Sequence, residues 1–268
     1  MSTLRRRTEE QAEDVWVKSN LYPQYYMNTW HYQSDGWMST DSAKVYETST
    51  ETLFLGRQDA MQRQTLVPLA GFVREMAAQG RLASDLRLLE VGAGTGRAMT
   101  FMIDNYPDMR FVCSELSPYY LQEARNNVRY YSRFKSSSSS SGGAAAAPDV
   151  SFLQAAAEDL PVEDESMDVV VNIYMFHELE LPVLKRVAAE MSRVLKPGGM
   201  LILTDSIQLG DRPKLNANLG NFKAFNEPNY VDYINLDLGK LFMDAGLLPD
   251  AKEVGSSTKT LSFRKPAA

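Results

Sequence analysis

Three glycines at alternate positions form the stretch of this sequence that is best suited to holding a ligand. Gly92, Gly94 and Gly96 follow the apolar run 86–91, and a helical pattern over 97–105 follows the glycines. Because glycine has no Cβ, a turn built from these residues brings its backbone close to a bound molecule. The helix after the turn would direct its positive N-terminal end toward that molecule. A tight strand-to-helix connection that binds nothing would contain the same glycines.

The spacing of the glycines distinguishes two kinds of nucleotide-binding turn. The dinucleotide fingerprint Gly-x-Gly-x-x-Gly requires its third glycine at the position that Arg97 holds in this chain. The glycines, preceded by an acid, instead resemble motif I of the class I S-adenosylmethionine (SAM) dependent methyltransferases. This resemblance implies that SAM is the cofactor. The residues that would lie against it here are Glu90, Gly92, Ala93, Gly94 and Gly96.

An acidic residue after the second expected strand extends the resemblance. Glu115 follows the apolar run 110–114. A carboxylate at this position accepts hydrogen bonds from the ribose hydroxyls of a nucleotide, and the family uses its acid in that way. Leu116, beside it, is included in the expected cofactor site. The alternative interpretation of Glu115 is an ordinary surface acid.

A loop after the third expected strand resembles the segment of the family that frames adenine. It contains Ala157 and Glu158, followed by Asp-Leu-Pro. The commonest version of this loop has an aspartate where this chain has Ala156. The adenine amino group would therefore depend on the backbone or on Glu158.

Two later stretches match the family in the expected order. Residues 166–170 resemble the strand-four motif, and the same strand adds Asn172 to the expected cofactor site. Residues 194–199 resemble the turn before strand five. Patterns at 176–179, 205–206 and 225–230 are similar to those of UbiE-type small-molecule enzymes. The resemblance covers about residues 65–265, and it implies the cofactor without identifying the acceptor.

Methyl transfer from a sulfonium is an in-line displacement that requires alignment of the reacting atoms and exclusion of water. A phenol, thiol or acidic carbon also needs a base, whereas a thioether or a free amine does not. His177 and His31 are the only histidines and therefore the candidate catalytic bases. His177 follows the fourth strand, at the sheet edge where open α/β proteins bind ligands. A structural hydrogen bond in a loop explains it equally well, and the sequence does not place His31.

The segment 16–46 is rich in aromatic residues that follow neither a helical nor a strand period. We interpret it as a cap over the acceptor, since aromatic rings attract cations and tyrosine and tryptophan also carry polar groups. An irregular piece that only packs on the domain is the alternative, and the two interpretations are compatible. The expected substrate-binding residues are Tyr22, Tyr26, Trp30, Tyr32 and Trp37, together with Phe176 after strand four.

The alternation of apolar runs and helical patterns predicts an α/β fold. We expect a Rossmann-like, seven-stranded, mostly parallel sheet flanked by helices, with the aromatic cap before it. Residues 1–64 would form the cap and lead-in, and 65–268 the methyltransferase domain with a low-complexity, flexible insertion at 135–148. Expected strands are 86–91, 110–114, 150–153, 168–173, 200–204, 251–254 and 259–263. Expected helices lie within 60–79 and at 97–105, 118–134, 182–195 and 230–245.

Composition limits the classes of function. The chain has 268 residues, a net charge of −6 and one cysteine, which excludes an internal disulfide and a multi-cysteine metal site. The acidic balance argues against a duplex nucleic-acid binder, and no apolar run has the length of a membrane span. We expect a small-molecule substrate, no metal, no nucleic-acid partner and a cytoplasmic protein. A plastid or another organelle would require that a transit peptide had been removed.

The sequence thus favours transfer of a methyl group from SAM to an oxygen, carbon or sulfur nucleophile of a small molecule. One alternative is a catalytically silent, methyltransferase-like protein that binds SAM. A nicotinamide-dependent oxidoreductase is disfavoured, because Arg97 interrupts the dinucleotide fingerprint.

Overall fold

The computed structural model describes residues 22–27, 36–136, 147–219 and 227–267. Three of the expected site residues, Trp30, His31 and Tyr32, lie outside the described residues, as does most of the low-complexity insertion.

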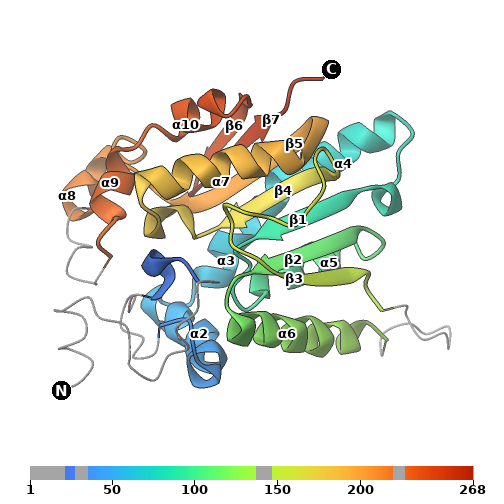
Figure 1. The fold of residues 1–268 in the computed structure, drawn as a ribbon, viewed down its shortest axis with the longest axis horizontal. Helices are drawn as coiled ribbons and strands as arrows, with labels where there is room; N and C mark the ends of the chain where they lie inside the picture. The colour runs from blue at the N-terminus through green and yellow to red at the C-terminus, as the bar shows by residue number, and fades with distance from the viewer. Residues whose placement is uncertain (1–21, 28–35, 137–146, 220–226, 268) are drawn as a thin grey trace.

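A seven-stranded sheet forms the centre of the part of the chain that the structure describes (Figure 1), with the order β3-β2-β1-β4-β5-β7-β6. β7 is antiparallel to both β5 and β6, and the other pairs are parallel. This confirms the predicted Rossmann-like fold. The strands are β1 (Arg87–Val91), β2 (Arg110–Glu115), β3 (Val150–Gln154), β4 (Met167–Ile173), β5 (Leu195–Ser206), β6 (Leu248–Val254) and β7 (Thr258–Arg264).

Helices cover both faces of the sheet, because successive side chains of a strand point to opposite faces. In β4 every residue is buried: Val169 and Val171 belong to one apolar cluster and Val170 to the other. The first cluster also contains side chains from α4 (Leu66–Ala78), α5 (Arg97–Asn105) and α6 (Pro118–Ser136). The second contains side chains from α7 (Leu181–Val194), α9 (Tyr230–Asn235) and α10 (Leu238–Asp244). The sheet is therefore a buried central layer.

Two boundaries differ from the sequence prediction. The expected helix 230–245 is divided into α9 and α10, because Leu236 is extended and the Asp237 carboxylate caps α10 by accepting from the N–H of Lys240. β5 begins at Leu195 rather than near 200. Its Pro-Gly-Gly run was expected to be a turn, but Gly198 N–H donates to the Lys265 carbonyl at 2.9 Å and fixes the run beside the C-terminal segment.

Several helical pieces precede the sheet. They are η1 (Gln24–Met27), α2 (Thr40–Leu53), α3 (Gln58–Gln62) and η2 (Arg63–Thr65), and Figure 1 shows α2 on the side where β1 and β2 end. Ser39 caps α2 by accepting from the N–H of Ser42 at 3.0 Å. The sequence pattern did not predict α2, since its apolar residues are few. Pro68 lies in the first turn of α4, where its missing N–H has no helical partner to lose. The remaining short elements are η3 (Ala83–Asp85), η4 (Phe176–Glu178), η5 (Pro213–Leu215) and α8 (Asn216–Leu219).

None of the helices built from the described residues combines the length and the apolar content that crossing a membrane requires.

Asp168 lies at the start of β4, at the sheet edge opposite the strand ends discussed below. Its carboxylate is 2% exposed, pairs with Arg81 at 2.7 Å and Lys196 at 2.8 Å, and accepts from the N–H of Arg87 at 3.0 Å. Burial alone would raise the pKa of Asp168, but these three donors hold it below its usual range. The aspartate of the family-like motif at 166–170 thus has a structural role, because it joins β4 to Arg81, Arg87 and Lys196.

We expect Asp168→Asn to lower the free energy of unfolding at pH 7 by about 1–3 kcal/mol. This is less than the usual cost of breaking a buried pair, because Arg81 and Lys196 are partly exposed. The carboxylate contributes stability above its unfolded pKa of about 3.9, and this contribution is lost as the pH falls through the lower folded value. Urea titrations from pH 3 to 7 should therefore show a shallower acid limb in the variant. Asp149→Asn, at an exposed position, is the control, and equal curves for Asp168→Asn and the unmodified protein would contradict the assignment.

Candidate functional site

A cavity of about 610 Å³ lies at the carboxyl ends of the parallel strands. One half, which we call the cofactor half, is formed by the glycine turn after β1, the end of β2 and the loop after β3. The other half, the acceptor half, is formed by η4, the residues after β5 and the segment around α9. Residues of α2 and α3 cover both. Expected site residues that line the cavity are Tyr26, Trp37, Glu90, Gly92, Ala93, Gly94, Glu115, Leu116, Ala157 and His177.

The glycine turn has the backbone conformation that its sequence predicts. Gly92, Gly94 and Gly96 have φ angles of 66°, 57° and 71°, which disfavour any other residue. A Cβ on Gly92 would lie 2.5 Å from the sulfur of Met175, and one on Gly96 would lie 2.8 Å from the Cβ of Ala124. A Cβ on Gly94 would meet no atom of the described residues within 4 Å. Gly96 is thus required for packing on α6, whereas Gly94 leaves its backbone open to the cavity.

Glu115 connects three parts of the cofactor half. Its Oε2 accepts from the N–H of Gly94 at 2.9 Å, and its Oε1 accepts from the N–H of Ser117 at 2.9 Å. The Tyr26 hydroxyl also donates to Oε1, at 2.7 Å. The carboxylate is buried, and these three donors carry no formal charge.

The adenine-type loop has an analogous contact with the N-terminal segment. The Tyr25 hydroxyl lies 2.8 and 2.7 Å from the two carboxylate oxygens of Glu158. Burial and the neighbouring Glu158 raise the pKa of Tyr25, so the phenol stays protonated and donates. Glu158 is therefore adjacent to the cofactor half through Tyr25, although it does not itself line the cavity.

The aromatic segment covers a different part of the cavity from the one expected. The Tyr26 ring stacks on Trp37, with centroids 5.2 Å apart, and on Tyr22 at 6.4 Å. Its hydroxyl contacts Glu115, so Tyr26 belongs to the cofactor half rather than to the acceptor half. Tyr22 packs outside the cavity lining. The substrate-binding role expected for Tyr26 stays a prediction, and Tyr22 does not line the cavity.

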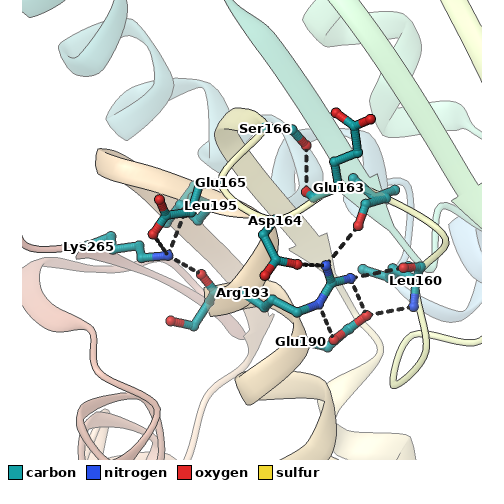
Figure 2. Close-up of polar contacts among 11 residues, drawn as sticks. Leu160, Glu163, Asp164, Glu165, Ser166, Glu190, Arg193, Leu195 and Lys265 are labelled. Carbon is teal, nitrogen blue, oxygen red and sulfur yellow. Dashed lines mark hydrogen bonds and ion pairs between the residues drawn. The ribbon is translucent and has the colours of Figure 1, made fainter.

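Figure 2 shows how the loop that follows Glu158 is fixed to α7. Arg193 donates to the carbonyls of Leu160 at 2.9 Å and Val162 at 2.8 Å, and it pairs with Glu190 at 2.6 Å. Glu190 in turn accepts from the N–H of Leu160 at 2.8 Å. The guanidinium thus satisfies backbone carbonyls that a loop without regular structure would leave unpaired. This holds the adenine-type loop in place from outside the cavity.

His177, in η4, faces the acceptor half between two carboxylates. Its Nδ1 lies 2.6 Å from Oδ1 of Asp205, and its Nε2 lies 3.4 Å from Oε1 of Glu178. Burial alone would lower the pKa of His177, but Asp205 and Glu178 raise it well above the usual value. The two carboxylates therefore favour the imidazolium form of the ring. The position agrees with the sequence prediction, but the charge state opposes the expected role as a proton acceptor.

Two further expected residues are buried away from the ligand space. Phe176 is fully buried and packs on Phe242, with ring centroids 5.4 Å apart, so it belongs to the core and not to a substrate site. Asn172 is also fully buried, and its amide donates to the carbonyl of Val91 at 2.7 Å. Asn172 therefore holds the residue that precedes the glycine turn and does not line the cavity.

The sequence did not identify several polar residues of the cavity wall. They are Glu47 and Gln58 near the glycine turn and Glu227 and Tyr230 in the acceptor half. The pattern at 225–230 was noted as a family resemblance and contains two of them. No sequence motif pointed to Glu47 or Gln58, because only the tertiary packing of α2 and α3 brings these residues to the cavity.

Buried carboxylates gather around the glycine turn. Burial, followed by the charges of Glu115 and Glu47, raises the pKa of Glu90 to about 8. Burial likewise raises the pKa of Glu47, whose carboxylate accepts from the hydroxyl of Thr95. Oε2 of Glu90 accepts no hydrogen bond from any of the described residues. These acceptors, together with the open Gly94, fit a nucleoside ligand that carries positive charge and hydrogen-bond donors.

No group of three or more His, Cys, Asp or Glu side chains within the described ranges is arranged to hold a metal ion.

Comparison with known proteins agrees with this fit. Residues 89–203 match the family model of the methyltransferase domain. Over 146 residues it is 28% identical to a malonyl-[acyl-carrier protein] O-methyltransferase of Paenibacillus sp. (strain JDR-2), covering 54% of this chain and 47% of the relative. Over 173 residues it is 30% identical to the tRNA N(3)-cytidine methyltransferase METTL2 of Gallus gallus, covering 62% and 44%. The chain thus spans less than half the length of these two relatives.

A solved structure shares the fold of the methyltransferase domain over nearly the whole chain. It is a putative O-methyltransferase from Nostoc punctiforme PCC 73102, with a TM-score of 0.58 and 15% identity. The match covers 98% of this chain and 67% of that one.

The charge state of His177 gives a stability prediction for the methyltransferase domain. A pKa raised in the folded state means that the imidazolium contributes stability fully below its unfolded pKa of about 6.5. The contribution is lost as the pH rises through the higher folded value. We expect His177→Gln, which keeps an amide donor for Asp205, to flatten the fall in stability between pH 6 and 9. Urea unfolding at each pH measures this, and parallel curves for the two proteins would show that His177 is neutral in the fold.

Proposed function

We propose that this protein transfers the methyl group of SAM to a small-molecule acceptor, as UbiE-type enzymes do. The observation that supports this most strongly is one continuous cavity joining the glycine turn and Glu115 to the polar wall around His177. Cofactor and acceptor would therefore meet in one cavity, where the reacting atoms can be aligned as methyl transfer requires. Its interior suits a small molecule better than a folded nucleic acid, and the net charge of −6 agrees with this.

In this proposal the cofactor half binds SAM through four elements. The carboxylate of Glu115 accepts from the ribose hydroxyls, and the Gly94 backbone lies beside the ligand because nothing blocks its approach. Glu90 takes the amino group of the cofactor, which its buried Oε2, without a hydrogen-bond partner among the described residues, favours. Ala157 and the loop fixed by Arg193 frame the adenine. Bound SAM supplies a methyl group activated by a positively charged sulfur.

His177 acts in the proposal as a positioning residue. Held between Asp205 and Glu178, the imidazolium fixes the Glu178 carboxylate at the acceptor half. It receives no proton near neutral pH, because its ring is already protonated. A proton lost by the acceptor would instead pass to a carboxylate of the wall or to water.

The cofactor assignment predicts the effect of two variants. Glu115→Ala should weaken binding of SAM and of S-adenosylhomocysteine by about 1.5–3 kcal/mol, because two bonds to a charged acceptor are lost. Glu115→Gln, which keeps the shape of the side chain, should weaken it in the same direction by less. Isothermal calorimetry measures both affinities, with Asp149→Asn as the exposed control. Unchanged affinity in Glu115→Ala, in a variant that melts normally, would refute the assignment.

Turnover tests the proposed function itself. The protein is incubated with methyl-labelled SAM and a metabolite extract, and labelled products are found by mass spectrometry. We expect a labelled small molecule together with S-adenosylhomocysteine. Binding of SAM without any labelled product would favour a silent SAM-binding protein, and label found in tRNA rather than in small molecules would contradict the acceptor class.

A further inference from the structure

The carboxylate of Glu47, on α2, joins the glycine turn to the start of α3. Its Oε1 accepts from the hydroxyl of Thr95, a residue of that turn, and its Oε2 accepts from Nε2 of Gln58 at 3.2 Å. The backbone N–H of Gln58 in turn donates to Glu51 at 2.6 Å. Glu47, Thr95 and Gln58 all line the cavity. Two acids of α2 thus fix the first residue of α3 at the wall of the cofactor half.

The side-chain amide of Gln58 has an oxygen that the protein does not satisfy. Gln58 is 3% exposed, and its Oε1 accepts from none of the described residues. The orientation of the amide follows from its chemistry, because only the nitrogen can donate to the carboxylate of Glu47. A buried acceptor without a donor destabilises a protein, and a ligand that supplies the donor removes this cost.

A second acceptor of the same kind lies close to Glu47. Oε2 of Glu90 also accepts from none of the described residues, and the charge of Glu47 is among the causes that raise the pKa of Glu90. Gln58 and Glu90 therefore both adjoin Glu47. The backbone of Gly94 lies in the same part of the wall, and a Cβ there would meet no described atom within 4 Å. Acceptors from α3 and β1 thus gather where the glycine turn leaves room for a ligand.

The charges around these acceptors favour a cationic group. Burial raises the pKa of Glu47 and of Glu90, because each carboxyl group has lost water. Arg97, the one arginine of the described wall, is already paired with Asp59 through two nitrogens. An ammonium group brings three N–H donors and a positive charge, whereas a hydroxyl brings a donor without charge and a carboxylate brings neither. An ammonium group is therefore the ligand group that fits this place.

Building on the proposed function, we infer that Gln58 is a further cofactor-binding residue, whose Oε1 accepts a hydrogen bond from the ammonium group of the methionyl part of SAM, beside Glu90. No bond forms or breaks at this contact. Holding the methionyl chain at its end orients the sulfur and its methyl group toward the acceptor half. The sequence gave residues 1–64 no part in binding the cofactor, because the contacts of Gln58 arise only in the tertiary fold.

Calorimetry with three ligands on one adenosine frame tests this inference without turnover. S-adenosylhomocysteine carries both an ammonium and a carboxylate, 4-(5′-adenosylthio)butyrate lacks the ammonium, and 5′-(3-aminopropylthio)-5′-deoxyadenosine lacks the carboxylate. Gln58→Met keeps the length of the side chain and removes the acceptor. We expect it to weaken binding of the two ammonium ligands by about tenfold or more, and that of the butyrate by less than about twofold.

Gln64→Met is the matched control. The amide oxygen of Gln64 is also buried and accepts from none of the described residues, but its side chain lies against Gly255 and does not line the cavity. All three ligands should therefore bind Gln64→Met as they bind the unmodified protein. In Gln58→Met, unchanged affinities would overturn the inference. An equal loss for all three ligands would overturn it as well, because a purely structural role of Gln58 does not distinguish between them.

A second variant keeps the test decisive if Gln58→Met does not fold. Gln58→Asn retains the amide but withdraws its oxygen by one methylene group, so the ammonium ligands should again lose affinity selectively. The outcome is separable from that for the proposed function. Failure of the unmodified protein to bind S-adenosylhomocysteine would refute the proposed function before any variant is made. Normal binding of S-adenosylhomocysteine, without a selective loss in either variant, would refute only the role of Gln58.

Discussion

The hydrogen bond from Gly94 N–H to Glu115 determines the geometry of the whole cofactor half. It joins the turn after β1 to the end of β2, and the same carboxylate accepts from Ser117 at the start of α6 and from Tyr26. A buried carboxylate is stable only where such donors replace water. All three donors are formally neutral, so none of them places a positive charge against the carboxylate of Glu115. Burial, followed by the charge of the neighbouring Glu115, raises the pKa of Glu90 to about 8.

The fold was predictable from local patterns because the central strands β1 and β4 are buried on both faces. The strands around the glycine turn read as continuous apolar runs, and the helices show a periodic apolar face. The failures have local causes as well. Asp237 begins a new helix in the middle of a periodic stretch, which apolar spacing alone does not reveal. Gly198 pairs with Lys265 through the backbone, so a run with turn composition is incorporated into β5.

The two halves of the site differ in how far the sequence specifies them. The cofactor half consists of short motifs whose residues are close in the chain. The sequence therefore predicted the glycine turn and Glu115 directly. The acceptor half is assembled from distant segments: His177 contacts Asp205 of β5 across 28 positions, and the Asn229 amide donates to the Glu178 carbonyl across 51 positions. Phe176 shows the converse error, since a residue next to a site residue on a 3₁₀ turn points into the core.

The N-terminal segment links the two halves energetically. Tyr26 and a ribose hydroxyl would donate to the same carboxylate, and Oε1 of Glu115 already accepts from Ser117 as well. A carboxylate has about four acceptor positions and three are filled, so a second ribose hydroxyl on Glu115 would require that the Tyr26 contact lengthen or move. Tyr22 and Trp37 would move with Tyr26, because the Tyr26 ring stacks on both of them. Trp37 also lines the cavity, and the proposed cofactor would thereby reshape the wall that encloses the acceptor.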